Sequence, residues 1–281
     1  MSGKSVLITG CSAGGIGFWL AKEFQKRGLT VFATGRDVSK MSELESLENV
    51  TLLALDVTSS TSISHAMEEV RSKTGGKLDY LVNNAGQSGH APVLDIDIGN
   101  AMKLFDVNFW GVLRMIQTFA PLLIEAKRTI VNMGSIVGIL YTPFGSMYNA
   151  SKAAGNHFSE NLRLELAPLD VKVVTVIVGS IHTNLMRNSY TPQLPPTSQY
   201  LAAEKCFENF RNGVRDYNVS EAEELAESVV GDVLNGATGK IWRGANSSKT
   251  RWASHLLPTS MLDTILLEGS ELDKVGPRGH V

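Results

Sequence analysis

The sequence predicts one α/β domain built on a doubly wound parallel sheet, and three observations support this fold class. Short apolar runs alternate with longer amphipathic runs from residue 5 onward, which is the pattern of repeated strand–helix–strand units. A chain of 281 residues suits one large domain better than two small ones. Residues 171–178 are strongly apolar, as expected of a strand buried on both faces. Right-handed crossovers then place helices on both faces and ligands outside the carboxyl ends of the strands.

The composition excludes several classes of protein. Hydrophobic residues make up 43% of the chain and charged residues 19%, which favours a packed core and excludes a disordered chain. The 26 Lys and Arg residues nearly balance the 28 Asp and Glu residues, and no basic stretch predicts nucleic-acid binding. The sequence shows neither a signal-peptide core nor an apolar run of about 20 residues. We therefore expect a soluble, cytoplasmic protein.

The two cysteines, Cys11 and Cys206, are too few for a disulfide scaffold and lack metal-ligand spacing. We therefore expect a reducing compartment and no metal site. Cys11 stands beside a glycine-rich turn and is expected only to pack there.

The elements follow in order along the chain. We expect about seven strands, at residues 5–9, 30–34, 50–55, 78–83, 129–133, 171–178 and 240–242. Helical spacing predicts helices at residues 15–27, 59–73, 98–126, 147–166, 201–215 and 220–234. Phe18, Ala21 and Phe24 recur on one face of the first helix, and Gly28 follows as a stop signal. Pro121 is expected to kink the third helix near its end.

The chain divides into a catalytic domain over residues 1–246 and a C-terminal extension over residues 247–281. Residues 180–215, rich at first in proline and polar residues, are the expected substrate loop. The extension is dense in apolar residues, namely Trp252, Leu256, Leu257, Met261, Leu262, Ile265, Leu266 and Leu267. It should pack on the core, on a partner subunit or over the substrate pocket. Its polar face is poor in lysine, so docking on a membrane surface is the least favoured alternative.

A glycine-rich turn, TGCSAGGIG at residues 9–17, separates the first expected strand from the first helix. Backbone N–H groups in such a turn can approach a pyrophosphate, and the amino end of the helix adds a favourable dipole. The spacing is not that of the strict dinucleotide fingerprint. We expect a nucleotide site here, with a purely structural turn as the alternative. Its expected contacts are Gly10, Ser12, Gly15, Ile16 and Gly17.

The end of the second strand predicts the cofactor. An acid at that position would bind the ribose 2′-hydroxyl of NAD, whereas a 2′-phosphate needs a cation. Gly35 stands there, and Arg36 follows with a guanidinium suited to phosphate. This predicts NADP(H), with a solvated surface arginine as the alternative. Asp56, after the third strand, is placed to bind the adenine amino group or to cap the next helix.

Four residues carry the expected chemistry. Tyr148 and Lys152 are four apart on a predicted helix and therefore share a face. A nearby ammonium lowers the pKa of a phenol, so Tyr148 could exchange a proton with a substrate oxygen during hydride transfer. Ser135 follows the fifth strand and could hold that oxygen. Asn108 lies in mid-helix, where asparagine is a poor helix former; a bound water or a backbone kink would explain it.

In order and spacing, these pieces resemble the short-chain dehydrogenase/reductase family over about residues 3–245. The matching residues are Thr9-Gly10 with Gly15-Ile16-Gly17, Asp56-Val57, Asn83-Asn84-Ala85-Gly86, Asn108 with Gly111, Ser135, Tyr148 with Lys152, and Gly179 with Thr183. The resemblance implies a Rossmann-type fold and a catalytic tetrad of Asn108, Ser135, Tyr148 and Lys152. It also implies that Tyr148 and Lys152 contact the cofactor, with Lys152 holding the nicotinamide ribose.

The resemblance assigns further cofactor contacts. Asn83 and Ala85 would line the adenosine ribose side, Asp56 and Val57 belong to the same set, and Ile181 and Thr183 would contact the nicotinamide amide. The sequence departs from the family pattern in three places. One extra residue separates Gly10 from Gly15, Gly134 replaces a frequent serine with little expected effect, and Val178 stands where proline is usual.

Within the family, residues 92–97, 148–152 and 162–168 resemble fungal NADPH-dependent 1-acyldihydroxyacetone-phosphate reductases. Residues 9–12 and 33–37 resemble NADP-dependent hydroxysteroid dehydrogenases. The resemblance implies a homodimer or homotetramer that acts in lipid or secondary metabolism on a small apolar carbonyl or alcohol. The reductase resemblance would also allow a peripheral position on the endoplasmic reticulum or lipid droplets.

The expected substrate side is largely apolar, which suits a lipid-like ketone. It comprises Ile139, Leu140, Tyr141, Phe144, Met147, Leu185, Met186 and Tyr190. Arg187 could bind a substrate phosphate or be an exposed loop charge, and His182 is interpreted as loop structure or a substrate contact. We predict NADPH-dependent reduction of a ketone to a secondary alcohol. The alternatives are NADP-dependent oxidation of a steroid-like or secondary-metabolite alcohol and, outside this class, a non-turnover NADP(H)-binding scaffold or a non-redox enzyme.

Overall fold

Seven parallel strands form the central sheet of a computed structural model that describes residues 3–185, 188–212 and 218–276. Their order across the sheet is β3-β2-β1-β4-β5-β6-β9, and each neighbouring pair is parallel. The strands are β1 (Ser5–Thr9), β2 (Thr30–Gly35), β3 (Val50–Ala54), β4 (Tyr80–Asn83), β5 (Thr129–Met133), β6 (Lys172–Val178) and β9 (Gly239–Arg243). The order reverses between β1 and β4, which is where such sheets bind ligands.

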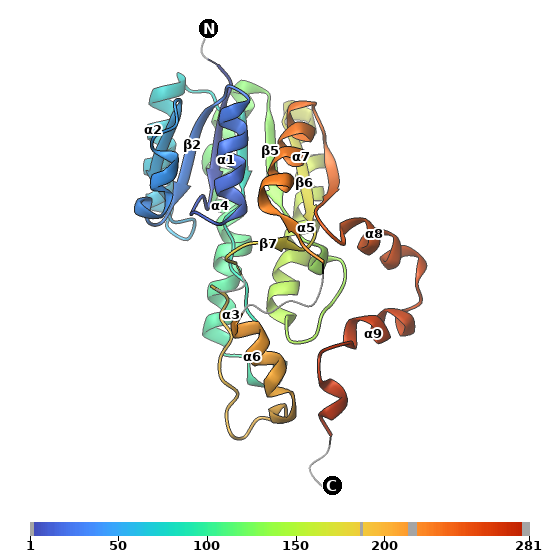
Figure 1. The fold of residues 1–281 in the computed structure, drawn as a ribbon. Coiled ribbons are helices and arrows are strands. Elements are labelled where there is room, and N and C mark those ends of the chain that lie inside the picture. Colours follow the sequence, from blue (N-terminus) through green and yellow to red (C-terminus); the bar gives the residue numbers. More distant parts are fainter. Residues whose placement is uncertain (1–2, 186–187, 213–217, 277–281) are drawn as a thin grey trace.

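Helices cover both faces of the sheet (Figure 1). One face carries α1 (Ile16–Lys26) and α7 (Ala222–Leu234), and the other carries α2 (Ser60–Thr74), α4 (Gly111–Ala126) and α5 (Ser146–Leu166). Successive strand residues point to opposite faces. Val6 and Ile8 accordingly join the core under α1 and α7, and Leu7 joins the core under α2, α4 and α5. The predicted doubly wound fold is confirmed.

The expected long helix at residues 98–126 contains an irregular turn around Asn108 and continues past Pro121 to Ala126. It consists of α3 (Ile98–Phe105), a π-helical turn (Asp106–Trp110) and α4, which contains Pro121 and continues to Ala126. In the described part of the chain, this is the stretch long and apolar enough to cross a membrane. Met115 and Phe119 of α4 belong to the core beneath the sheet, whereas Ile98 and Met102 of α3 are exposed.

Short elements gather beyond the carboxyl ends of the strands (Figure 1). The strands β7 (Ile181–His182) and β8 (Ser220–Glu221) pair in a small second sheet, and α6 (Glu204–Asn212) follows a 3₁₀ turn. The helix expected at residues 201–215 thus exists in part, and residues 213–217 lie outside the described residues. The 3₁₀ turns are Val38–Leu44, Val93–Asp95, Ile136–Gly138, Ala167–Leu169, Leu201–Ala203 and Leu272–Lys274.

The C-terminal extension forms α8 (Ser247–Leu256), α9 (Thr259–Leu267) and the turn Leu272–Lys274. Leu272 and Val275 pack against a small apolar core, which we name the Phe207 cluster. Its buried members are Phe144, Leu194, Ala203, Cys206 and Phe207. The end of the extension therefore contacts residues of its own chain within the predicted substrate loop. Whether Trp252, Leu256 and the other exposed residues of α8 and α9 meet a partner subunit stays a prediction.

Candidate active site

The glycine-rich turn is held against the ends of β1 and β4. Asn84 Nδ2 donates hydrogen bonds to the carbonyl oxygens of Thr9 at 2.8 Å and Gly10 at 3.1 Å. The Thr9 hydroxyl oxygen accepts from the N–H groups of Asn84 and Ala85, both at 2.9 Å. A Cβ atom at Gly17 would collide with Gly10 O and the Asn84 side chain, so this close approach needs glycine. Asn84, which the sequence shows only as part of a family motif, therefore shapes the turn.

The turn leads directly into the amino end of α1. Gly15 is the N-cap residue and supplies no side-chain cap to the first N–H groups of the helix. Gly10 and Gly14 both have φ of 75°, a conformation that favours glycine. An uncapped helix start behind a glycine turn is an arrangement that binds phosphate groups. Cys11 is fully buried and burial raises the pKa of its thiol to about 12, which agrees with a packing role.

Arg36 lies just after β2 with an exposed side chain. Among the residues that the structure describes, it forms no ion pair. The neighbouring Asp37 is engaged elsewhere, because its carboxylate accepts from the N–H and the hydroxyl of Ser39 at 3.0 and 2.6 Å. These hydrogen bonds lower the pKa of Asp37. The Arg36 guanidinium is therefore available to a phosphate at the end of β2.

Asp56, after β3, folds back on its own turn. Its Oδ1 accepts from the N–H and the hydroxyl of Thr58 at 2.9 and 2.8 Å. The cap of α2 is instead Ser59, whose hydroxyl oxygen accepts from the N–H of Ser62 at 3.2 Å. The capping role considered for Asp56 thus belongs to Ser59. Within the described residues Asp56 Oδ2 has no hydrogen bond and remains open to a ligand.

Two predicted cofactor contacts have side chains that point into the core. Asn83 is 4% exposed and its Nδ2 donates to Asn132 Oδ1 at 2.8 Å. Val57 is 7% exposed and packs against Gly111, where a Cβ atom would lie 2.8 Å from Val57 Cγ2. Only their main-chain atoms remain for a cofactor. Ala85, in contrast, follows the end of β4 beside the glycine-rich turn.

Tyr148 and Lys152 lie on α5 at the predicted helical spacing. Lys152 Nζ donates to the carbonyl oxygen of Met133 at 3.0 Å, and burial lowers the pKa of its ammonium to about 8. A Cβ atom built on Gly86 would lie 3.4 Å from Asn108 Oδ1 and 3.8 Å from Lys152 Nζ. Asn108 and Lys152, far apart in the sequence, therefore converge on the main chain that follows β4.

Asn108 lies in the π-helical turn and is 5% exposed. Its Oδ1 accepts from the N–H of Gln87 at 2.8 Å, and its Nδ2 donates to Gln87 O at 2.9 Å and Ser151 Oγ at 3.0 Å. The π turn corresponds to the backbone kink that the sequence offered as one explanation for Asn108. The amide side chain joins the π turn to α5 and to the segment after β4, and π turns are frequent at functional sites.

Ser135 follows β5 after Gly134 and is the N-cap of the 3₁₀ turn Ile136–Gly138. Its Oγ accepts from the N–H of Val137 at 3.3 Å, which leaves the hydroxyl hydrogen free for another acceptor. Its main chain is bound by Asn156 of α5, whose Oδ1 accepts from the Ser135 N–H at 3.3 Å and whose Nδ2 donates to Ser135 O at 3.0 Å. Asn156 was missed from the sequence, although it follows Lys152 by four residues.

The segment after β6 runs along the end of β9. The Gly179 N–H donates to Arg243 O at 2.9 Å, and a Cβ atom there would collide with Ala245 O. Gly179 thus determines the path of the main chain after Val178, the residue that stands where proline is usual in the family. Ile181 is 5% exposed, whereas Thr183 is half-buried and its Oγ1 accepts from the N–H of Leu185 at 3.3 Å.

The geometry joins a glycine-rich phosphate turn to a tyrosine–lysine pair at one end of a parallel sheet, and the comparisons agree. The model of the short chain dehydrogenase family matches residues 4–194. The chain belongs to the short-chain dehydrogenase family. It is therefore an oxidoreductase of the kind that the sequence predicted.

Relatives of this short-chain dehydrogenase extend over nearly its whole length. Short-chain dehydrogenase ptmH of Penicillium ochrochloron is 45% identical over 268 residues, which cover 95% of this chain and 98% of the relative. The NADPH-dependent 1-acyldihydroxyacetone phosphate reductase of Schizosaccharomyces pombe is 38% identical, with 90% of each chain covered. A solved short chain dehydrogenase from Burkholderia cenocepacia, in complex with NADP, has 26% identity and a TM-score of 0.74 over 95% of this chain and 98% of that chain.

Among the residues predicted to line the substrate side, Phe144 is buried. It is 8% exposed and its ring centroid lies 4.6 Å from that of Phe207. Tyr141 is exposed, and its hydroxyl donates to Asp263 of α9 at 2.8 Å. His182 Nδ1 lies 3.4 Å from Glu221 Oε2 across the β7–β8 pair, which favours loop structure. Met186 and Arg187 lie outside the described residues.

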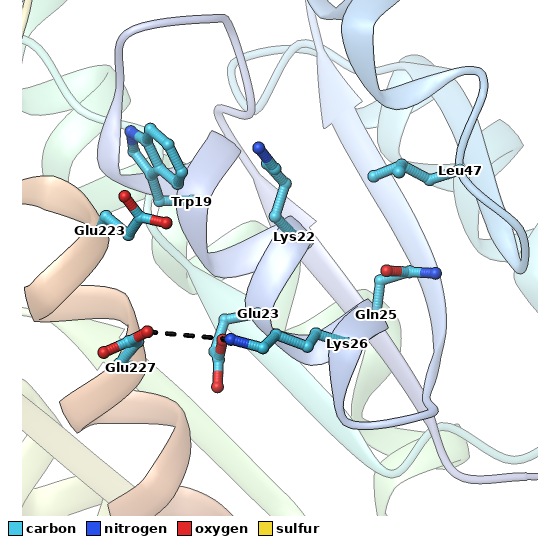
Figure 2. Close-up of a pocket in the computed structure, with 8 residues that line it drawn as sticks. All are labelled: Trp19, Lys22, Glu23, Gln25, Lys26, Leu47, Glu223 and Glu227. Atoms are coloured by element: carbon cyan, nitrogen blue, oxygen red, sulfur yellow. Dashed lines mark ion pairs between the residues drawn. The ribbon is translucent and has the colours of Figure 1, made fainter.

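Two shallow hollows contain none of the predicted site residues. One of about 220 Å³ lies between α1 and α7 and is crossed by the Lys26–Glu227 ion pair at 3.9 Å (Figure 2). In it, Lys22 Nζ lies 4.6 Å from the ring centroid of Trp19. The other, of about 260 Å³, lies at the start of β6 beside Lys172. Neither hollow is at the carboxyl ends of the strands.

Proposed function

We propose that the protein reduces a ketone on an apolar, lipid-like or polyketide-derived substrate to a secondary alcohol, with NADPH as the hydride source and Tyr148 as the general acid. The observation that carries this proposal is the position of Lys152. Its ammonium lies one helical turn from Tyr148, binds Met133 O, and approaches Asn108 beside the main chain of Gly86. A set of polar side chains held this closely at the ligand end of the sheet is what hydride chemistry on a carbonyl requires.

The residues present fit NADP(H). The uncapped start of α1 behind Gly10 and Gly14 would hold the pyrophosphate. The exposed guanidinium of Arg36 would hold the 2′-phosphate, since Gly35 leaves no acid there to oppose it. The relative from S. pombe is named NADPH-dependent and the B. cenocepacia structure contains NADP. Both names support the same cofactor for this chain. When bound, the cofactor supplies the hydride.

The proton would come from Tyr148. Lys152, with a pKa of about 8, is largely an ammonium at neutral pH. This charge favours the phenolate, which brings the Tyr148 hydroxyl closer to the acidity that proton transfer needs. Ser135, whose hydroxyl hydrogen is not used by Val137, would donate to the substrate oxygen and stabilise the charge that develops there. Asn108 would hold α5 and the segment after β4 in register.

The proposed substrate class rests on the apolar residues that lie near Ser135 and Tyr148 in the chain and after β7. Three of these residues lie between Ser135 and Tyr148 in the chain, namely Ile139, Leu140 and Met147. Two more, Leu185 and Tyr190, follow β7. These side chains are apolar or aromatic and suit a lipid-like ketone. The expected phosphate contact of Arg187 stays a prediction. So does assembly into a homodimer or homotetramer, which light scattering of the purified protein would measure.

The test is consumption of NADPH with a series of apolar ketones, followed by the absorbance of the reduced nicotinamide. We expect turnover by the natural chain and, from Tyr148→Phe, retained NADPH binding with turnover lost at least about a hundredfold. Oxidation of the corresponding alcohols with NADP would show the reverse direction. Binding of NADPH without turnover in either direction would instead support a scaffold or sensor. Unchanged turnover by Tyr148→Phe would exclude Tyr148 as the acid.

A further inference from the structure

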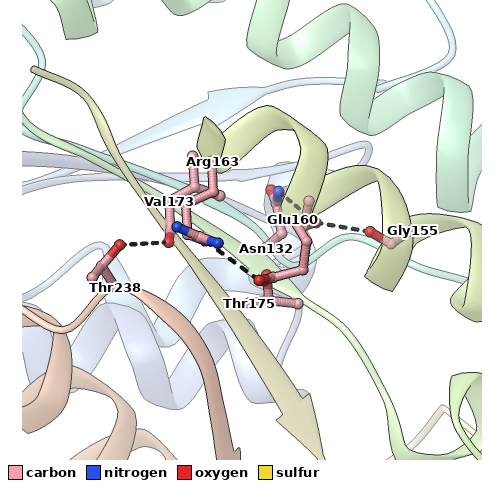
Figure 3. A network of polar contacts seen from close by, with 8 residues as sticks. Asn132, Gly155, Glu160, Arg163, Val173, Thr175 and Thr238 are labelled. Atoms are coloured by element: carbon pink, nitrogen blue, oxygen red, sulfur yellow. Dashed lines mark hydrogen bonds and ion pairs between the residues drawn. The ribbon is translucent and has the colours of Figure 1, made fainter. Parts of the chain in front are cut away.

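One face of α5 continues the tyrosine–lysine pair by two more turns. Tyr148, Lys152, Asn156 and Glu160 are spaced by four residues and therefore line one stripe of the helix. Each of the last three binds a different part of the sheet. Lys152 binds Met133 O, Asn156 binds Ser135, and Glu160 Oε1 accepts from the hydroxyl of Thr175 at 2.9 Å. Figure 3 shows the C-terminal end of this stripe, where Glu160 contacts Thr175 and Arg163.

Asn156 holds both main-chain groups of Ser135. It accepts from the Ser135 N–H at 3.3 Å and donates to Ser135 O at 3.0 Å, and it is only 3% exposed. With the N–H and the C=O of one residue fixed, the direction of its Cα–Cβ bond is fixed as well. Only the rotation about that bond remains, and the hydrogen bond from the Val137 N–H to Ser135 Oγ restricts it. Asn156 therefore sets where the Ser135 hydroxyl points.

Two glycines make room for this contact. A Cβ atom at Gly134 would collide with Asn156 Oδ1, and one at Gly138 would collide with Asn156 Nδ2 and with the main chain of Lys152. The glycine at 134, expected from the sequence to matter little, thus has a physical reason. A serine at this position would displace the Asn156 side chain. Gly134 and Asn156 form a matched pair, which brings the turn after β5 directly onto the helical turn that carries Lys152.

We infer that Asn156 is a positioning residue that aims the Ser135 hydroxyl at the oxygen that Tyr148 protonates. The inference rests on the proposed function. Asn156 is buried and bound to the main chain of Ser135, so its proposed effect on the reaction would pass through Ser135. A displaced Ser135 hydroxyl should lower kcat rather than cofactor affinity, since a displacement of about 1 Å lowers turnover by up to about a hundredfold.

The test is a double-mutant cycle between Asn156→Ala and Ser135→Ala in the full-length protein with NADPH and a ketone. We expect Asn156→Ala alone to lower kcat about tenfold or more with an unchanged Kd for NADPH. In the Ser135→Ala background the same change should lower kcat by less than about twofold. The matched control is Ser159→Ala. Ser159 is buried on the same helix and accepts from Asn132 Nδ2 at 3.0 Å, away from Ser135. Its effect should be the same in both backgrounds.

The inference would be overturned if Asn156→Ala lowered kcat as much in the Ser135→Ala background as it does alone. That result would show a general effect on α5. A second pair of variants tests the steric fit between Gly134 and Asn156. Gly134→Ser should lower kcat in the natural chain, and the double variant Gly134→Ser with Asn156→Ala should be no worse than Asn156→Ala. A double variant that is much worse would contradict the steric pairing.

Hydrogen exchange separates this inference from the proposed function. If the natural chain reduces no ketone, the proposed function fails and the contact can still be measured. Asn156→Ala should then speed exchange of the Ser135 amide by about tenfold relative to Ser159→Ala, because its buried acceptor is gone. Equal exchange in the two variants would overturn the contact itself.

Discussion

Lys152 Nζ donates a hydrogen bond to the main-chain carbonyl oxygen of Met133 at 3.0 Å. This bond joins α5 to the last residue of β5 and places the ammonium beneath the segment that leads to Ser135. Burial lowers the pKa of Lys152 to about 8. The charge on which the proposed proton transfer depends is therefore sensitive to pH near this value.

Ketone reduction should decline as the pH rises through about 8, because Lys152 then loses the proton that makes Tyr148 acidic. The measurement is the pH dependence of kcat/KM in the direction of reduction. Lys152→Arg is the control, since an arginine stays protonated throughout this range. It should move the decline to higher pH, even if turnover is lower. A decline at the same pH in both proteins would assign it to another group.

Burial of the Lys152 ammonium should lower the stability of the folded protein. Its pKa is near 10.5 in the unfolded chain and about 8 in the folded one, so the unfolded chain binds more protons between these values. The free energy of unfolding should therefore rise as the pH goes from about 8 to 10.5. Below about 8, the full cost of burying the Lys152 ammonium remains. Lys152→Met should keep or raise Tm at neutral pH while turnover is lost. A lower Tm at neutral pH would show that the bond to Met133 outweighs the cost of burial.

Arg36→Ala should weaken binding of NADPH about tenfold or more and leave NADH nearly unaffected, since only NADPH carries a 2′-phosphate. The measurement is Kd for both cofactors at two salt concentrations. Arg71→Ala serves as the control, because Arg71 is an exposed arginine of α2 paired with Glu68. An equal loss for NADPH and NADH would place Arg36 outside the 2′-phosphate site.

Gly17→Ala should lower both NADPH affinity and Tm. The added methyl group would meet Gly10 O and the Asn84 side chain, and forcing an atom into such a contact costs about 1–3 kcal/mol. Gly231→Ala is the matched control, since Gly231 lies inside α7 with open space around its Cα. It should raise Tm, because alanine is the better helix former by about 1 kcal/mol. A stable Gly17→Ala with unchanged affinity would contradict the close approach.

The fold and the order of the candidate site residues along the chain were predictable because they depend on local sequence patterns. Apolar strands such as residues 5–9, the glycine-rich turn and the four-residue spacing from Tyr148 to Lys152 are each encoded within a few neighbouring residues. The helical stretch at residues 98–126 shows the limit of such reasoning. Its interruption lies at Asn108, where the amide binds Gln87 and Ser151, residues that are distant in the sequence.

Side-chain direction at the strand ends was not predictable in the same way. Asn83 and Asn84 are adjacent and chemically identical, yet Asn83 turns into the core toward Asn132 while Asn84 binds the glycine-rich turn. The alternation along a strand sends successive side chains to opposite faces, and a one-residue shift exchanges their roles. Asn156 was missed for a related reason, since its partners are main-chain atoms of Ser135, which no sequence motif displays.

The last prediction concerns the C-terminal extension. Glu271 Oε2 accepts from the N–H of Cys206 in the first turns of α6 at 3.2 Å, and Lys274 Nζ donates to Glu271 Oε1 at 2.7 Å. The lysine lowers the pKa of Glu271, so the carboxylate stays charged and complements the amino end of the helix. Leu272 follows directly and packs against the Phe207 cluster. The extension thus holds α6, which lies in the segment predicted to form the substrate loop.

Glu271→Ala should therefore raise KM for bulky ketones and speed exchange of the Cys206 and Phe207 amides, with Kd for NADPH unchanged. The matched control is Glu268→Ala, an exposed glutamate three residues earlier that has no ion pair or hydrogen bond among the residues that the structure describes. It should alter neither quantity. A change in exchange without a change in KM would mean that α6 is held by the extension but does not limit the substrate. Identical behaviour of the two variants would show that the contact to Cys206 carries no weight in positioning α6.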